Sequence, residues 1–207
     1  MQSASASVKA KFRQRLKIHT QGHDMTKAFA SQGDLAEKTI SFTEIGDGLY
    51  AFTAEGDPNS GVIIGDTSVM VVEAQATPRL AQKVIDCIRG VTDKPISHVV
   101  LTHYHAVRVL GASAFRAPQV IMSEAARNMV AERGQEDWDS EFQRFPRLFQ
   151  CHESIPGLTW PTTTFNGKMT VWLGKRRVDI LQVGRAHTAG DAVVHVPDQN
   201  VMFTGDI

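Results

Sequence analysis

The stretch that decides the fold is Leu101-Thr102-His103-Tyr104-His105, which follows an apolar run at residues 96–101. That run is rich in β-branched residues and is bounded by polar ones, so it predicts a buried strand. In an extended segment, residues two positions apart point to the same side, whereas in a helix they diverge. A loop that leaves this strand can therefore aim both imidazoles at one point.

Two further stretches carry the same kind of side chain just beyond a predicted strand. Gly184-Arg185-Ala186-His187-Thr188-Ala189-Gly190-Asp191 follows a predicted strand at 178–183, and Thr204-Gly205-Asp206 follows one at 201–203. The HxH pair alone is a weak signal, but three donor segments that each follow a predicted strand would much more rarely arise by chance. Three imidazoles and a carboxylate suit a borderline-soft divalent cation.

The order of predicted elements indicates two sheets packed together with helices outside. Pro78 begins a predicted helix that Gly90 ends, and Ser123 is a candidate N-cap for another over 123–133, followed by a helical segment from 137 that Pro146 interrupts. Residues 111–115 are expected to be helical and residues 155–165 to form a loop. The remaining predicted strands are 42–45, 49–54, 61–65, 69–73, 169–173 and 192–196.

Composition argues weakly against two classes of partner, although a local basic patch stays open. Lys+Arg and Asp+Glu both number 22 in the 207 residues, so no uniform field favours nucleic acid or an anionic membrane. No apolar run approaches the roughly 20 residues that span a bilayer. Cys87 and Cys151 lack CxxC spacing, and the N-terminus lacks an apolar signal region. We therefore expect a cytoplasmic protein with a small-molecule substrate. The chain could also form a homo-oligomer, which the sequence does not decide.

The chain divides near residue 40. Residues 1–40 lack a sustained apolar period and carry a basic run from Lys9 to Lys17. They predict an N-terminal extension that is either poorly structured or docks onto a partner. Residues 41–207 carry all the motifs and predict one domain.

The three motifs, in this order and spacing, resemble those of the metallo-β-lactamase-fold hydrolases. The runs at 104–111 and 156–161 resemble the SoxH-like, or quinoprotein-relay-associated, branch. The resemblance implies an αβ/βα four-layer sandwich with the metal site at one edge between the sheets. It also implies that a metal-bound water attacks an ester, lactam, thioester or phosphodiester. The family's last histidine lies further along, so the closing C-terminal part of the fold is expected to be absent at Ile207.

Carried over residue by residue, the resemblance places one metal on His103, His105 and His187, with Asp206 as fourth ligand. The family's HxHxDH reads HxHxVR here, so Val107 and Arg108 replace two ligands of a second metal. An alkyl chain and a guanidinium offer no lone pair. We therefore expect one ion, with zinc the first candidate and iron the second.

Supporting roles follow for other polar residues. The positive charge of Arg108 is expected to replace that of the second metal ion. It would do so either by pairing with Asp206 or by holding a substrate carboxylate. The alternatives for Arg108 are a plain structural ion pair or a side chain that faces solvent. If Asp206 does not itself bind the metal, it would orient the water. Glu73 and Asp191 are expected to support the ligands from behind, and the alternative for Glu73 is a turn residue.

These residues favour a mononuclear metallohydrolase that acts on a small ester, lactone, thioester or related acyl substrate. Val107 and Arg108 favour the alternative, a weak or inactive member kept as a binding or accessory module. A less favoured alternative is an iron-dependent sulfur-compound oxygenase.

Overall fold

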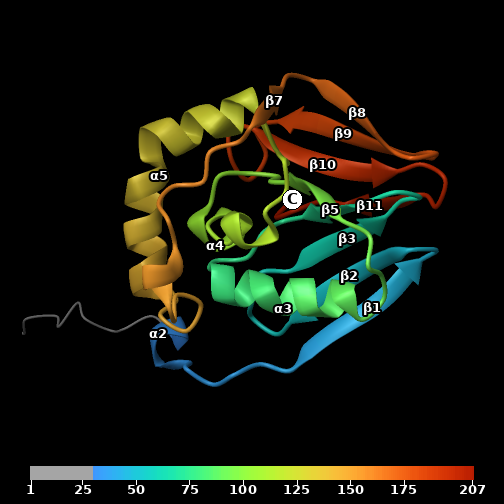
Figure 1. The fold of residues 1–207 in the computed structure, drawn as a ribbon. Coiled ribbons are helices and arrows are strands. Elements are labelled where there is room, and N and C mark those ends of the chain that lie inside the picture. The colour runs from blue at the N-terminus through green and yellow to red at the C-terminus, as the bar shows by residue number, and fades with distance from the viewer. Residues whose placement is uncertain (1–29) are drawn as a thin grey trace, which may run out of the picture.

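Two β-sheets pack face to face in the computed structural model, which describes residues 30–207 (Figure 1). The larger sheet has seven strands in the order β1-β2-β3-β4-β5-β6-β7, antiparallel from β1 to β4 and parallel from β4 to β7. Its strands are β1 (Ile40–Gly46), β2 (Leu49–Ala54), β3 (Ser60–Ile64), β4 (Val69–Val72), β5 (Ile96–Val100), β6 (Gln119–Ser123) and β7 (Thr163–Phe165).

The smaller sheet is antiparallel throughout, in the order β11-β10-β9-β8. Alternate residues of its strands face the larger sheet and bury their side chains against it, as a half-buried strand period requires. The strands are β8 (Lys168–Leu173), β9 (Arg176–Gly184), β10 (Asp191–Val196) and β11 (Val201–Phe203). The buried core between the sheets includes Leu49, Ile63, Met70, Val72, Val100, Ile121, Leu173, Val178, Ile180 and Val194.

Helices cover the outer face of the larger sheet (Figure 1). Thr77 caps the first long helix by accepting a hydrogen bond from the Leu80 N–H at 3.2 Å, and Ser123 caps another by accepting one from the Ala126 N–H at 3.0 Å. The helical elements are α2 (Ala30–Gly33), α3 (Pro78–Arg89), α4 (Ala106–Val109), η1 (Ala112–Phe115), α5 (Glu124–Arg144) and η2 (His152–Ser154).

The expected class, an α/β sandwich of two sheets with helices outside, is confirmed, and three local expectations need correction. Strand β6 was not predicted, and the expected loop at 155–165 contains β7. The two helical segments expected over 123–133 and from 137 onward are one helix, α5. It ends at Arg144, two residues before Pro146, because the residue before a proline is pushed out of the helical region.

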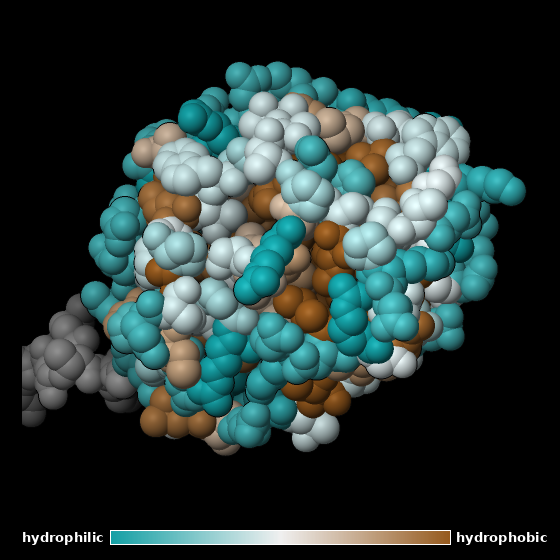
Figure 2. Space-filling view, in the orientation of Figure 1, coloured by the Kyte–Doolittle hydropathy of each residue, from teal (hydrophilic) through white to brown (hydrophobic). Residues whose placement is uncertain are grey.

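The opposite face of the smaller sheet carries no helix within residues 30–207, so three of the four implied layers are present there. Trp172 and Met202 on that face are 60% and 49% exposed. On the face drawn in Figure 1, hydrophobic residues show in a patch near the centre and in smaller patches toward the left, upper right and lower edges, with hydrophilic residues between them (Figure 2).

Much of the predicted N-terminal extension, residues 1–29, lies outside the described residues. The remainder leads through α2 to β1, which begins at Ile40, and Gln32 donates a hydrogen bond to the Gln143 carbonyl of α5 at 2.9 Å. None of the helices in residues 30–207 combines the length and apolar character needed to cross a bilayer.

Candidate metal centre

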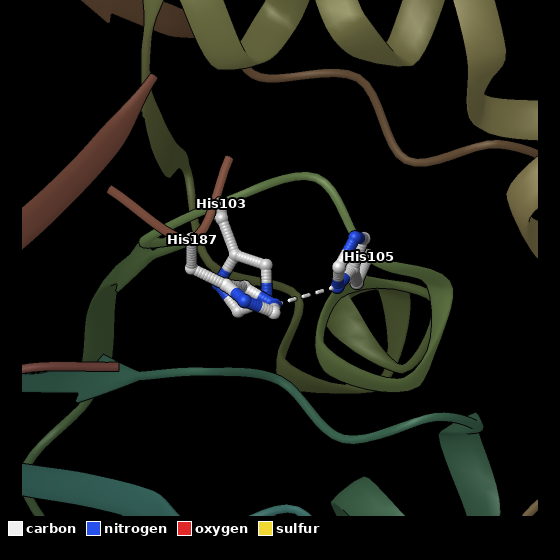
Figure 3. Close-up of side chains that lie close together, drawn as sticks. All are labelled: His103, His105 and His187. Atoms are coloured by element: carbon white, nitrogen blue, oxygen red, sulfur yellow. Dashed lines mark hydrogen bonds between the residues drawn. The ribbon is translucent and has the colours of Figure 1, made fainter. Parts of the chain in front are cut away.

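Four predicted ligands meet at one edge of the sandwich, each from a segment that follows a strand. His103 and His105 lie between β5 and α4, His187 lies in the loop from β9 to β10, and Asp206 follows β11. His105 itself has an extended backbone (φ −61°, ψ 134°) at the start of α4, whereas the chain bends at Thr102 and His103. The three imidazoles converge (Figure 3).

The geometry of the three rings fits a single small cation. One nitrogen of each ring lies within 4.8 Å of a nitrogen of the others, and His105 Nδ1 is 3.2 Å from His187 Nε2. Two nitrogens bound to one tetrahedral zinc lie about 3.3 Å apart, given a Zn–N distance of about 2.0–2.1 Å. The rings are nearly perpendicular to one another, at 81–87°.

His103 presents a nitrogen with nothing to bind among the described residues. Its side chain is 1% exposed, its Nδ1 lies 2.9 Å from the Thr102 hydroxyl, and its buried Nε2 has no hydrogen-bond partner. Burial first, and the neighbouring His105 second, lower the pKa of His103 well below its usual range. A neutral ring with an unpaired buried nitrogen is what a metal ligand requires, so the residues present fit the expected ion.

Asp206 adds a carboxylate oxygen to the same point. Its Oδ2 lies 3.6 Å from His103 Nε2 and 3.8 Å from His187 Nε2. The preceding Gly205 has φ +62°, and a Cβ there would collide with the Thr102 side chain. The close contact between Gly205 and Thr102 therefore joins the end of β11 to the ligand-bearing loop.

Arg108 occupies the far side of Asp206. Its Nη2 lies 2.5 Å from Asp206 Oδ1, and the two side chains are 17% and 24% exposed. Asp206 thus faces the histidine cluster with one oxygen and a guanidinium with the other. Among the two expected arrangements of Arg108, the pair with Asp206 is the one observed. Val107 packs against the hydrophobic core under the helices.

Glu73 supports the loop that carries the ligands. It follows β4 with φ 67°, and its Oε1 accepts a hydrogen bond from the Thr102 N–H at 2.7 Å. Its Oε2 is buried and has no hydrogen-bond partner within the described part of the chain. Burial raises the pKa of Glu73 to about 7, although the Arg108 charge acts in the opposite direction. Glu73 is therefore more than a turn residue.

Asp191 holds the loop of the third histidine. The carboxylate is 1% exposed and accepts hydrogen bonds from the Thr188 N–H, at 2.6 Å, and from the Thr188 hydroxyl. These two bonds close the segment directly after His187. They support the position of the ligand through the backbone, because Asp191 contacts Thr188 and not the imidazole.

Asp137 in α5 is a site residue that the sequence reasoning missed. Its Oδ2 accepts a hydrogen bond from the Ala106 N–H at 2.7 Å, and its Oδ1 lies 3.8 Å from His105 Nε2. One signal was available: Asp137 extends the buried stripe of α5 formed by Val130 and Gly134 at helical spacing. A carboxylate on the core-facing stripe of a helix needs a partner.

Comparison with known proteins agrees with this geometry. Residues 53–207 match the sequence model of the Metallo-beta-lactamase superfamily. The chain belongs to this superfamily. Its members are mostly metal-dependent hydrolases, and in this chain His103, His105 and His187 could hold one ion.

Solved structures show the same fold at low sequence identity. A metallo-β-lactamase from Pontibacter korlensis matches with a TM-score of 0.62 and 18% identity over 80% of this chain and 71% of its own. The protein TMB-1 matches with 0.59 and 15%, over 80% and 69%. A double mutant of the sec-alkyl sulfatase PisA1 matches with 0.60 and 16%, over 81% and 31%.

Proposed function

We propose that this chain is a mononuclear metal-dependent hydrolase acting on a small ester, lactone, thioester or related acyl substrate. The observation that carries the proposal is the convergence of His103, His105 and His187 with Asp206, while Arg108 fills the far side of that carboxylate. One site has a full set of donors. Val107 and Arg108 stand where the resemblance has two ligands of a second metal, and neither side chain can act as a ligand, which supports a single ion.

The imidazoles would hold the ion, with zinc proposed first and iron second. Zinc supplies Lewis acidity there: it lowers the pKa of a coordinated water to about 7 and polarises an acyl carbonyl. Asp206 Oδ2 faces the same point and can accept a hydrogen bond from the attacking water, which orients its lone pair. Because Arg108 holds Oδ1, the carboxylate cannot rotate freely away from that position.

A cavity of about 220 Å³ adjoins the Arg108 side of the centre and suits a small substrate. Arg108 and Glu73 both contribute to its wall. The apolar and small residues of the wall include Ile45, Ala51, Gly61, Val72 and Phe203.

We also propose that the chain belongs to the SoxH-like branch, which the runs at 104–111 and 156–161 support, and that it is cytoplasmic, which the cysteine usage supports. The alternative function is a binding or accessory module, and the pairing of Asp206 with Arg108 favours it because it leaves one carboxylate oxygen for water.

Metal content and hydrolysis together test the proposal. The protein would be purified without chelators and measured by elemental analysis, beside His103→Ala and a matched control, His195→Ala, which changes a half-buried histidine in β10 away from the cluster. We expect about one equivalent of metal in the wild type and the control and almost none in His103→Ala.

Hydrolysis of a panel of p-nitrophenyl esters, lactones and thioesters should follow the metal content. Metal binding without hydrolysis of any member would favour the binding module. A wild-type protein that binds neither zinc nor iron would refute the metal site itself.

A further inference from the structure

The orientation of His105 differs from that of the other two imidazoles. His105 turns Nδ1 toward the cluster, 3.2 Å from His187 Nε2, whereas His187 and His103 turn Nε2 toward it. A neutral imidazole carries its proton on one nitrogen only, and the other nitrogen is the one that can bind a cation. His105 can therefore serve the site only as the tautomer protonated at Nε2.

Asp137 is the group that faces this second nitrogen. Its Oδ1 lies 3.8 Å from His105 Nε2, and the carboxylate is 12% exposed. The separation exceeds the length of a hydrogen bond, so in this structure the carboxylate acts on the ring through its charge. A carboxylate accepts and does not donate, and its negative charge favours a proton on the nearer nitrogen.

The second oxygen of Asp137 fixes the backbone next to the ligand. Oδ2 accepts a hydrogen bond from the Ala106 N–H at 2.7 Å, at the start of α4. A single side chain of α5 thus holds residue 105 from two directions, through its ring and through the following peptide.

We propose that Asp137 is a positioning residue for the metal centre, which selects the Nε2–H tautomer of His105 and so presents Nδ1 to the ion. The inference rests on the proposed function, because the Nε2–H tautomer matters only if His105 binds a metal ion through Nδ1. Partners on the outer nitrogen of a histidine ligand fix its tautomer and orientation, and their loss typically costs about 10- to 100-fold in metal affinity.

The variant Asp137→Asn separates the two contacts. Asparagine has nearly the same shape, and its carbonyl oxygen can still accept from the Ala106 N–H. Its amide group then faces His105 Nε2 as a donor, which disfavours a proton there. The matched control is Asp139→Asn, on the same helix, whose carboxylate is exposed and accepts a local hydrogen bond from Gln135 at 2.9 Å.

Two measurements on these proteins decide the matter. Zinc dissociation constants come from competition with a chromophoric chelator, and the tautomer of His105 in metal-free protein comes from long-range ¹H–¹⁵N NMR. We expect zinc binding about 10- to 100-fold weaker in Asp137→Asn than in the wild type, with His105 shifted toward the Nδ1–H tautomer. Asp139→Asn should match the wild type in both.

Either of two outcomes would overturn the proposal. One is a zinc dissociation constant for Asp137→Asn within about twofold of the wild type. The other is a His105 ring that stays protonated at Nε2 in the variant, even with weakened zinc binding, since that would leave Asp137 a purely structural role. If the wild type binds no zinc, the proposed function fails, but the tautomer measurement still decides what Asp137 does.

Discussion

Replacement of Glu73 by glutamine should make the metal-free protein increasingly more stable than the wild type as the pH rises. Glu73 is buried, one of its oxygens has no hydrogen-bond partner within the described residues, and burial raises its pKa to about 7. Glutamine resembles the protonated acid in shape, does not titrate, and keeps an oxygen that can accept from the Thr102 N–H.

The direction and magnitude of this stability difference follow from the linkage between protonation and folding. The pKa of Glu73 is about 7 in the folded protein, against 4.5 for the model acid, so between these values the folded state binds more protons. Wild-type stability therefore contains a contribution that is complete below pH 4.5 and is lost as the pH rises through 7. At about 1.4 kcal/mol for each pH unit, the loss amounts to about 3 kcal/mol.

Urea unfolding of metal-free protein at about pH 5, 6, 7 and 8 provides the assay. The difference in unfolding free energy between Glu73→Gln and the wild type should grow by about 2.5 kcal/mol across this range, because a small part of the loss has already occurred at pH 5. The control Glu136→Gln changes an exposed carboxylate of α5 and should give a nearly constant difference. The reasoning would be refuted by a difference for Glu73→Gln that is flat or that falls as the pH rises.

Two more substitutions test the contacts that build the centre. Gly205→Ala should lower the unfolding free energy by about 2 kcal/mol in urea titrations, because φ is +62° and the added methyl group meets Thr102; equal stability would contradict the close approach. Arg108→Met should destabilise metal-free protein by about 2 kcal/mol, because Asp206 loses its counter-charge while remaining partly buried. Zinc should restore more stability to this variant than to the wild type in thermal unfolding, and a smaller restoration would contradict the idea that guanidinium and metal share this carboxylate.

Much of the fold could be predicted because its strands are short, β-branched and punctuated by turn residues. The two unpredicted strands, β6 and β7, had weaker local signals. Strand β7 has three residues, and its pairing with β6 comes from the parallel sheet rather than from its own pattern. Helix α5 was divided in the prediction at residues 134–136, yet Gly134 packs inside the helix against Leu158. There, tertiary packing outweighs the low helix propensity of glycine.

The candidate site divides in the same way. The sequence predicts four candidate ligands from their residue types and from their positions after predicted strands, namely His103, His105, His187 and Asp206. The sequence marks Asp137 only as a carboxylate on the core-facing stripe of α5. Its contact with His105, 32 positions away, depends on how α5 crosses the loop. The same holds for the pairing of Arg108 with Asp206, which only the structure shows.

The sequence by itself determined which donors are present, that the positions of Val107 and Arg108 offer no ligand, and that strands alternate in a pattern suited to two packed sheets. Only the tertiary structure decided which nitrogen of each ring faces the centre, which carboxylates contact the ligands or the loops that carry them, and which group pairs with the second oxygen of Asp206. The physical reason is that ligand type is a property of single side chains. Convergence, burial and the protonation that burial imposes are instead properties of segments that the sheets bring together from distant parts of the chain.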